Sequence, residues 1–159
     1  MFDYSEIQDA EIYKKGDLWY SDNTFVDAVI TIESNHKANA YNKYSGAKGL
    51  FQFVPSTARQ YGLDNPFSPE QSLKAFKKLT ADNIRQLLKF NIPVTPVNIY
   101  LAHQQGASGF RKAYNHMKNN SPISDTLLRN IKNNSLGGFK SIIQWYEDWQ
   151  SRIERGMQS

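Results

Sequence analysis

The sequence contains no cysteine, and this absence excludes disulfide bonds and thiolate metal sites. It also contains no apolar run near the roughly 20 residues that a membrane-spanning helix requires. Its acidic first residues lack the basic segment and apolar core of a signal peptide. We therefore expect a protein that is made in a reducing compartment, without a signal peptide and without stable membrane insertion.

Other familiar site patterns are missing as well. The three histidines, His36, His103 and His116, do not have the spacing of metal ligands, and no glycine-rich loop is suited to binding phosphate. We expect no metal and no cofactor. A chain of 159 residues is long enough to bury a sizeable core, and we expect a single globular domain over residues 1–159.

Acidic residues are scarce after the first fifth of the chain. Residues 1–33 contain 2 Lys or Arg against 8 Asp or Glu, whereas residues 34–110 contain 9 against 3 and residues 111–159 contain 8 against 4. A basic surface on the last two thirds fits an anionic polymer, with nucleic acid and bacterial cell wall as the two candidates. An ordinary solvated lysine-rich surface is the alternative.

Helical periodicity and capping signals dominate the chain. Thr24 followed by Asp27 resembles a capping box, and the apolar residues that follow recur at helical spacing as far as Glu33. The first 23 residues suggest a short helix around Tyr4–Tyr13 and a turn at Lys15–Asp17. We predict an all-α, lysozyme-like fold of seven or eight helices, with room for a minor β-hairpin near 41–53. The further helices are predicted at 55–61, 69–90, 96–105, 108–118, 124–131 and 139–153, the last ones completing the core over 120–159. Pro55, Pro69 and Pro96 fit helix starts, and Ser124 is expected to cap its helix. Leu88 is expected on the buried stripe of the helix at 69–90.

Glu33 is the strongest catalytic candidate. It follows Val29 and Ile30 by four and three residues, so its carboxyl group projects from the edge of an apolar helix face. Glycoside cleavage needs an acid that is protonated near neutral pH, and burial beside apolar groups raises the pKa of a carboxyl group. The alternative is a water-exposed glutamate at a helix end.

Three motifs, in order, carry a family resemblance. They are Glu33-Ser34, Gly46–Gln52 (GAKGLFQ) and Pro55–Ala58 (PSTA). Together they closely resemble the signature of the soluble lytic transglycosylase (SLT) family over about residues 22–115. The resemblance implies a goose-type lysozyme fold and cleavage of the MurNAc–GlcNAc bond of peptidoglycan, with a 1,6-anhydro product. Glu33 would be the acid that then acts as base.

The resemblance also implies a set of substrate-binding residues. Ser34 would pack or hydrogen-bond beside the acid, Gln52 would contact the substrate, and Leu50 and Phe51 would shape the wall of the site. The family's later motif falls on residues 102–106, where His103 and Gln104 replace a tyrosine and an asparagine. Tyr100 is expected to take over part of the missing tyrosine's role.

Two other functions remain open. A muramidase would need a second carboxylate, for which Asp27, Asp64 and Glu70 are the candidates, and each of them has a simpler structural role. A non-catalytic wall-binding or virion protein would keep the fold without the chemistry. We expect a monomer that binds peptidoglycan glycan strands and not nucleic acid. A small basic wall lysin without a signal peptide resembles a phage endolysin or virion component, made in the host cytoplasm and acting on the cell wall.

Overall fold

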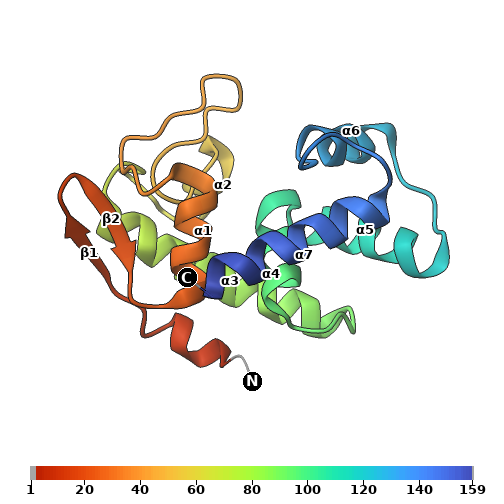
Figure 1. Ribbon diagram of the computed structural model, residues 1–159, viewed down its shortest axis with the longest axis horizontal. Helices are drawn as coiled ribbons and strands as arrows, with labels where there is room; N and C mark the ends of the chain where they lie inside the picture. The colour runs from red at the N-terminus through yellow and green to blue at the C-terminus, as the bar shows by residue number, and fades with distance from the viewer. Residues whose placement is uncertain (1–2, 159) are drawn as a thin grey trace. The chain divides into compact units, whose positions relative to one another are not determined.

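The computed structural model describes residues 3–158 of the chain and is mostly helical, which confirms the predicted fold class (Figure 1). The chain forms two compact units. Where the structure describes it, the first unit runs to Ala81 and includes Gly156–Gln158, and the second unit is Asp82–Arg155. None of the helices in the described part is long and apolar enough to cross a membrane.

The first unit starts with a short 3-10 helix and a hairpin. The 3-10 helix η1 is Tyr4–Ile7, and strands β1 (Ile12–Lys15) and β2 (Leu18–Ser21) pair antiparallel, with Tyr13 opposite Tyr20. The predicted helix around Tyr4–Tyr13 is therefore wrong beyond Ile7. Gly16 has a φ of 64°, which favours glycine and closes the turn, and β-branched and aromatic residues on either side favour strands. Residues 41–53 form only isolated bridges, in which Lys48 pairs with Tyr41 and with Phe53.

Helix α1 (Thr24–Ser34) follows the hairpin and carries Glu33 in its last turn. Its cap is Asn23, whose side chain accepts a hydrogen bond from the Val26 N–H at 3.0 Å. The predicted capping box of Thr24 and Asp27 is wrong. The Asp27 carboxylate instead accepts a hydrogen bond from the Ser21 N–H at 2.8 Å, and this bond ties the hairpin to the helix. The face that includes Phe25, Val26, Val29 and Ile30 is buried, as the periodicity predicted.

His36 fastens the hairpin to the end of α1. Its carbonyl accepts from the Trp19 N–H at 2.9 Å, and its Nδ1 lies 2.8 Å from the Trp19 carbonyl oxygen. Its Nε2 lies 2.9 Å from the Thr31 hydroxyl, and its ring stacks on Tyr20. The chain after Glu33 is therefore held by side-chain and backbone contacts on two elements.

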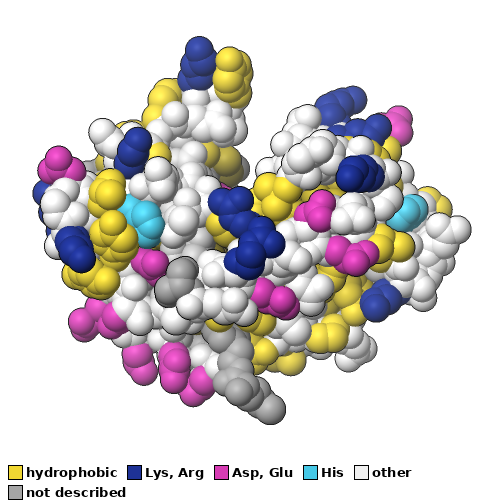
Figure 2. All heavy atoms as spheres, viewed as in Figure 1, with side chains coloured by type: hydrophobic (Ala, Val, Ile, Leu, Met, Phe, Trp, Pro, Cys, Tyr) yellow, Lys and Arg dark blue, Asp and Glu magenta, His cyan; other side chains and the backbone are white. Residues whose placement is uncertain are grey.

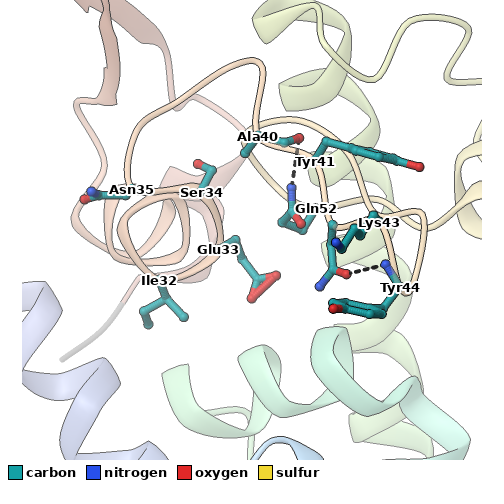
Figure 3. A pocket seen from close by; sticks show the side chains of 10 residues that line it. Ile32, Glu33, Ser34, Asn35, Ala40, Tyr41, Lys43, Tyr44 and Gln52 are labelled. Carbon is teal, nitrogen blue, oxygen red and sulfur yellow. Dashed lines mark hydrogen bonds between the residues drawn. The ribbon is translucent and has the colours of Figure 1, made fainter.

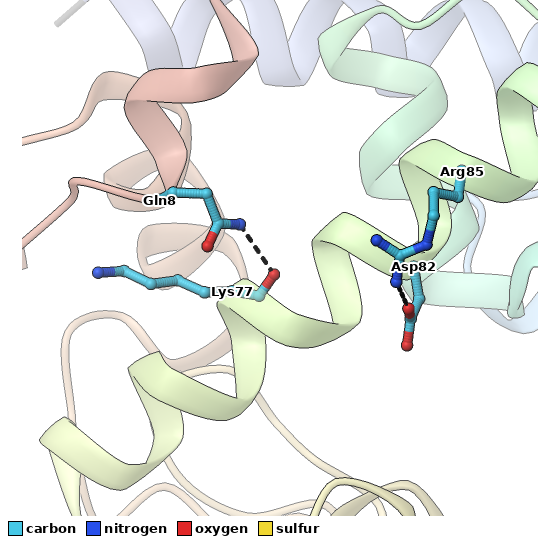
Figure 4. Close-up of polar contacts among 4 residues, drawn as sticks. All are labelled: Gln8, Lys77, Asp82 and Arg85. Carbon is cyan, nitrogen blue, oxygen red and sulfur yellow. Dashed lines mark hydrogen bonds and ion pairs between the residues drawn. The ribbon is translucent and has the colours of Figure 1, made fainter.

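The rest of the first unit contains a long loop, helix α2 (Pro55–Gln60) and the start of helix α3 (Pro69–Lys89). Pro55 occupies the first turn of α2, as predicted. The rings of Phe51 and Phe76 stack at 4.4 Å in the buried core. The Gln8 side chain also donates a hydrogen bond to the Lys77 carbonyl at 3.2 Å, joining the segment after η1 to α3 (Figure 4).

The second unit contains the end of α3 and four further helices. These are α4 (Pro96–Gln105), α5 (Ala107–Asn119), α6 (Asp125–Asn133) and α7 (Ile142–Gln158), of which α7 ends in the first unit. Thr95 and Ser124 cap α4 and α6 through their side chains, and Ser124 was predicted to do so. An exposed ion pair joins Asp82 and Arg85 one turn apart on α3 (Figure 4).

The aromatic residues of α7 complete the core of this second unit. Trp145 and Trp149 are buried, and the Trp149 indole donates to the Asn134 carbonyl at 2.6 Å. The Tyr146 hydroxyl donates to Asn98 Oδ1 at 2.7 Å, and burial raises the pKa of Tyr146 to about 12. The predicted start of the last helix at Phe139 is wrong, because α7 begins at Ile142, and the Ser141 hydroxyl accepts from the Gln144 N–H at its first turn.

Candidate active site

An open pocket of about 720 Å³ lies in the first unit, between the last turn of α1 and the loop that follows it. Figure 3 shows the Glu33 side chain extending from the helix into the pocket, with Gln52, Lys43 and Tyr44 contributed by the loop. The lining residues are Ile32, Glu33, Ser34, Asn35, Ala40, Tyr41, Asn42, Lys43, Tyr44 and Gln52. Three residues predicted for the site, Glu33, Ser34 and Gln52, are therefore brought together.

The end of α1 determines where the Glu33 carboxyl group lies. Asn35 and His36 have φ values of 52° and 67°, in the left-handed region, so the helix stops directly after Ser34 and the chain turns sharply. Asparagine tolerates this conformation better than most residues do. Glu33 is half-buried in the last turn of α1, and it lines the pocket beside Ile32. The carboxyl group is thus held on a rigid element and still faces the pocket.

Gln52 is held from the opposite wall by two hydrogen bonds. Its Nε2 donates to the Gly49 carbonyl at 3.0 Å. It also donates to the Ala40 carbonyl at 3.3 Å (Figure 3). Both amide hydrogens are thereby engaged with the backbone, which fixes the orientation of the group. Gln52 also has a φ of 52°, an uncommon value for a residue other than glycine, which is typical of strained functional loops.

The other predicted residues of this unit support the site from behind. Ser34 is buried, and its hydroxyl donates to the Ile30 carbonyl at 3.0 Å within α1. Leu50 and Phe51 are fully buried in the core and do not line the pocket. They hold the loop in place beneath Gln52.

The remaining predicted residues lie on α4 in the second unit. Tyr100 is buried and packs against Trp149, with ring centroids 5.2 Å apart, and the His103 ring lies 6.1 Å from the Tyr100 ring. Gln104 Oε1 accepts a hydrogen bond from the Gln105 side chain at 2.9 Å. Their roles in substrate binding stay predictions.

The sequence motifs did not predict most of the residues that the loop after α1 contributes to the pocket. Tyr41, Lys43 and Tyr44 line it, although the motifs did not single them out. Two tyrosines flanking a lysine within a polar, glycine-containing loop were a visible signal, because large aromatic residues are uncommon in a loop that is predicted to be solvated.

The pocket contains a single carboxylate. Among its lining residues only Glu33 is acidic. Asp27 is engaged with Ser21, and Asp64 and Glu70 are exposed and do not line the pocket. No cluster of three metal-ligating side chains occurs among residues 3–158. The arrangement suits acid–base chemistry by one carboxyl group.

A mostly helical fold with one glutamate at the end of an apolar helix, facing an open pocket, is the arrangement expected of a lysozyme-like protein. Residues 11–126 match the family model of the transglycosylase SLT domain, and the chain belongs to this family. Membership indicates lytic transglycosylase activity on peptidoglycan. The match begins earlier and ends later than the range of 22–115 that the motifs predicted.

Proposed function

We propose that Glu33 is the only acid–base residue in a lytic transglycosylase reaction that cleaves the MurNAc–β-1,4–GlcNAc bond and leaves 1,6-anhydroMurNAc. The observation that carries this proposal is the single carboxylate of the pocket. A hydrolase of either stereochemistry requires a second carboxyl group, about 5–10 Å from the first. An intramolecular hydroxyl can replace the attacking water, so one acid is sufficient.

The position of Glu33 suits the first step of this reaction. It is the penultimate residue of α1, and its side chain lines the open pocket, where a glycosidic oxygen can approach the carboxyl group. Glu33 donates its proton to the glycosidic oxygen, the bond from this oxygen to C1 breaks, and the GlcNAc end of the strand leaves as an alcohol.

The same carboxylate completes the reaction as a base. It takes the proton of the C6 hydroxyl of the muramic acid, and the freed oxygen bonds to C1 and closes the anhydro ring. Glu33 is then protonated again and ready for the next cleavage. Gln52 orients the substrate beside the acid in this proposal, and the two hydrogen bonds that hold its amide to the backbone support that role. We assign Tyr100, His103 and Gln104 on α4 to substrate binding as well.

A digest of purified peptidoglycan tests the proposal. Mass spectrometry of the wild-type products should find reducing-end muramic acid that lacks one water, and ordinary reducing ends would instead identify a muramidase. The variant Glu33→Gln should lose at least about 100-fold in rate, because removing a general acid–base typically costs that much or more. Its thermal unfolding should stay close to that of the wild type, since Glu33 is only half-buried.

We also propose that the protein acts in lysis of the bacterial cell wall, as an endolysin or a virion component. Lysis of permeabilised Gram-negative cells tests the lytic activity on which this role depends. Wild-type protein should reduce the turbidity of the suspension, and Glu33→Gln should not. Equal lysis by both proteins would remove Glu33 from the mechanism. Binding to the cells without lysis by either protein would favour a non-catalytic wall-binding protein.

A further inference from the structure

The outer end of the pocket loop displays two aromatic side chains and a cation to solvent. Tyr44 is 90% exposed and Tyr41 is 58% exposed, and both line the pocket with Lys43 (Figure 3). Figure 2 shows hydrophobic and Lys or Arg side chains side by side at the outer end of this loop. We call Tyr41, Lys43 and Tyr44 the ledge. At these exposures the two rings contribute little hydrophobic stabilisation to the fold, least of all Tyr44.

The side chains of the ledge are exposed, but hydrogen bonds hold its backbone in place. Asn42 Oδ1 accepts hydrogen bonds from the Tyr44 N–H at 2.9 Å and the Ser45 N–H at 3.2 Å. The Asn42 N–H donates to the Ala47 carbonyl at 2.9 Å, and the Gly46 N–H donates to the Asn42 carbonyl at 2.8 Å. Asparagine thus closes a turn on both sides of the tip. Aromatic groups held in this way lose little conformational freedom when a ligand binds.

The chemistry of the ledge combines a flat apolar face with a positive charge. Lys43 Nζ lies 5.3 Å from the centroid of the Tyr44 ring, within the range of a cation–π contact. Residues 34–54 contain three lysines and no acidic residue, and Glu33 is the one acidic residue that lines the pocket, so the loop that carries the ledge has a net positive charge that favours an anionic ligand. A sugar ring has apolar C–H faces that stack on tyrosine, and a carboxylate attached to that sugar pairs with lysine.

We propose that the ledge recognises the peptide-bearing amino sugar of the glycan strand, with Tyr44 and Tyr41 stacking on sugar rings beside the bond to be cleaved and Lys43 pairing with a carboxylate of the attached peptide. The proposal rests on the proposed function and names the part of its substrate that this side of the site selects. The ledge gives binding strength and preference for charged wall over neutral glycan. The chemistry itself stays with Glu33.

A binding assay that does not depend on cleavage tests this proposal. The protein carries Glu33→Gln and is sedimented with two preparations of peptidoglycan sacculi. One is native, and in the other the carboxylates have been converted to neutral amides with a carbodiimide and ethanolamine. Lys43→Gln and Tyr44→Ala are added separately. The matched controls are Lys78→Gln and Tyr13→Ala, which remove the same side chains at exposed positions of the first unit outside the pocket lining.

The two substitutions should act differently on the two preparations. Tyr44→Ala should weaken binding to both by about 3- to 10-fold, the usual range for one aromatic contact. Lys43→Gln should weaken binding to native sacculi by about 2- to 5-fold and leave binding to amidated sacculi unchanged. Both controls should bind like the parent protein. Thermal unfolding of Tyr44→Ala, Lys43→Gln and Lys78→Gln should match the parent, because these side chains are exposed. Tyr13→Ala removes a ring that stacks on Tyr20, so its binding is measured at a temperature where thermal unfolding shows it to be folded.

Several outcomes would overturn the proposal. Unchanged binding by Tyr44→Ala, equal losses in the two lysine variants, or no measurable binding of the parent protein to native sacculi would each do so. Equal weakening of Lys43→Gln on native and amidated sacculi would reject the carboxylate partner. A wild-type protein that binds through the ledge but releases no anhydro product would instead overturn the proposed reaction.

Discussion

Gly49 shows at the scale of one residue how the pocket loop is constrained. Its φ is +82°, and a Cβ placed there would lie 1.9 Å from the Pro66 carbonyl oxygen. Only glycine fits, because any side chain would collide with backbone that cannot move aside cheaply. The Gly49 carbonyl also accepts the hydrogen bond that orients Gln52. The glycine of the GLFQ motif is therefore structural, and it supports a residue of the site.

Gly49→Ala should lower the free energy of unfolding by about 2–4 kcal/mol, from left-handed strain together with the collision. Urea unfolding of wild type and variant measures this loss. Gly62→Ala is the matched control. Gly62 has a φ of +64°, but a Cβ placed there would meet nothing within 4 Å, so this variant should lose only about 1 kcal/mol. Equal losses at the two positions would mean that the contact with Pro66 is absent in solution.

At the scale of elements, the start of α1 shows which of two candidate residues, Asn23 or Thr24, caps the helix. Asn23 accepts from the Val26 N–H, whereas no hydrogen bond to the Thr24 side chain is found in the described part of the chain. Asn23→Ala should therefore lower the unfolding free energy by about 1 kcal/mol, a typical value for an N-cap. Thr24→Ala should stay within about 0.5 kcal/mol of the wild type.

Thermal unfolding of the two variants side by side measures the difference. A larger loss for Thr24→Ala than for Asn23→Ala would restore the capping box that the sequence pattern suggested. Both positions lie ahead of Glu33 on the same helix, so a frayed α1 in the Asn23 variant should also reduce cleavage of peptidoglycan.

Element prediction succeeded where the signals were local. The proline starts of α2, α3 and α4 and the serine cap of α6 were all visible as short motifs. The strands of the hairpin at Ile12–Ser21 were missed, although the turn between them was predicted, because four-residue strands carry few alternating positions and the periodicity of this segment is weak. Exposed Leu88 was also wrongly placed on the buried stripe of α3, since periodicity does not show where a helix leaves the core.

At the scale of the whole molecule, unfolding at alkaline pH should depend on Tyr146. Its pKa is raised to about 12 by burial, with the nearby Tyr114 phenol adding to the rise, against an ordinary value near 10. A raised pKa means that the folded state favours the neutral phenol. Its contribution to stability is therefore complete below pH ~10 and is lost as the pH rises from about 10 to 12.

Tyr146→Phe tests this by removing the ionisable group. At neutral pH the variant should be about 1–3 kcal/mol less stable, because buried Asn98 Oδ1 loses its donor. Urea unfolding at intervals from pH 9 to 12 should then show the two proteins converging, as the wild type loses stability more steeply. Parallel loss of stability in both proteins would contradict the raised pKa.

The charge distribution is also a property of the whole chain. Exposed acidic side chains of the first 22 residues gather around η1 and the hairpin, as Figure 2 shows, and lysines are spread over the later elements. The basic elements attract an anionic polymer, and salt weakens that attraction.

The sequence by itself determined the helical class, most helix starts, the family and the glutamate at the end of α1. Each of these features depends on a short stretch of sequence, such as apolar residues with a 3.6-residue period, a capping residue or a motif with constant spacing. Leu50, Phe51 and Gln52 were likewise visible as part of a motif, but their separate environments were not.

Only the tertiary structure decided what surrounds Glu33. The pocket joins the last turn of α1 to a loop whose shape depends on Gly49 against Pro66, His36 against Trp19 and Gln52 against Ala40. These contacts join residues more than ten positions apart, and neither local propensity nor periodicity specifies which partner each will meet. The same long-range contacts bury Leu50 and Phe51 and leave Tyr41, Lys43 and Tyr44 exposed beside the acid.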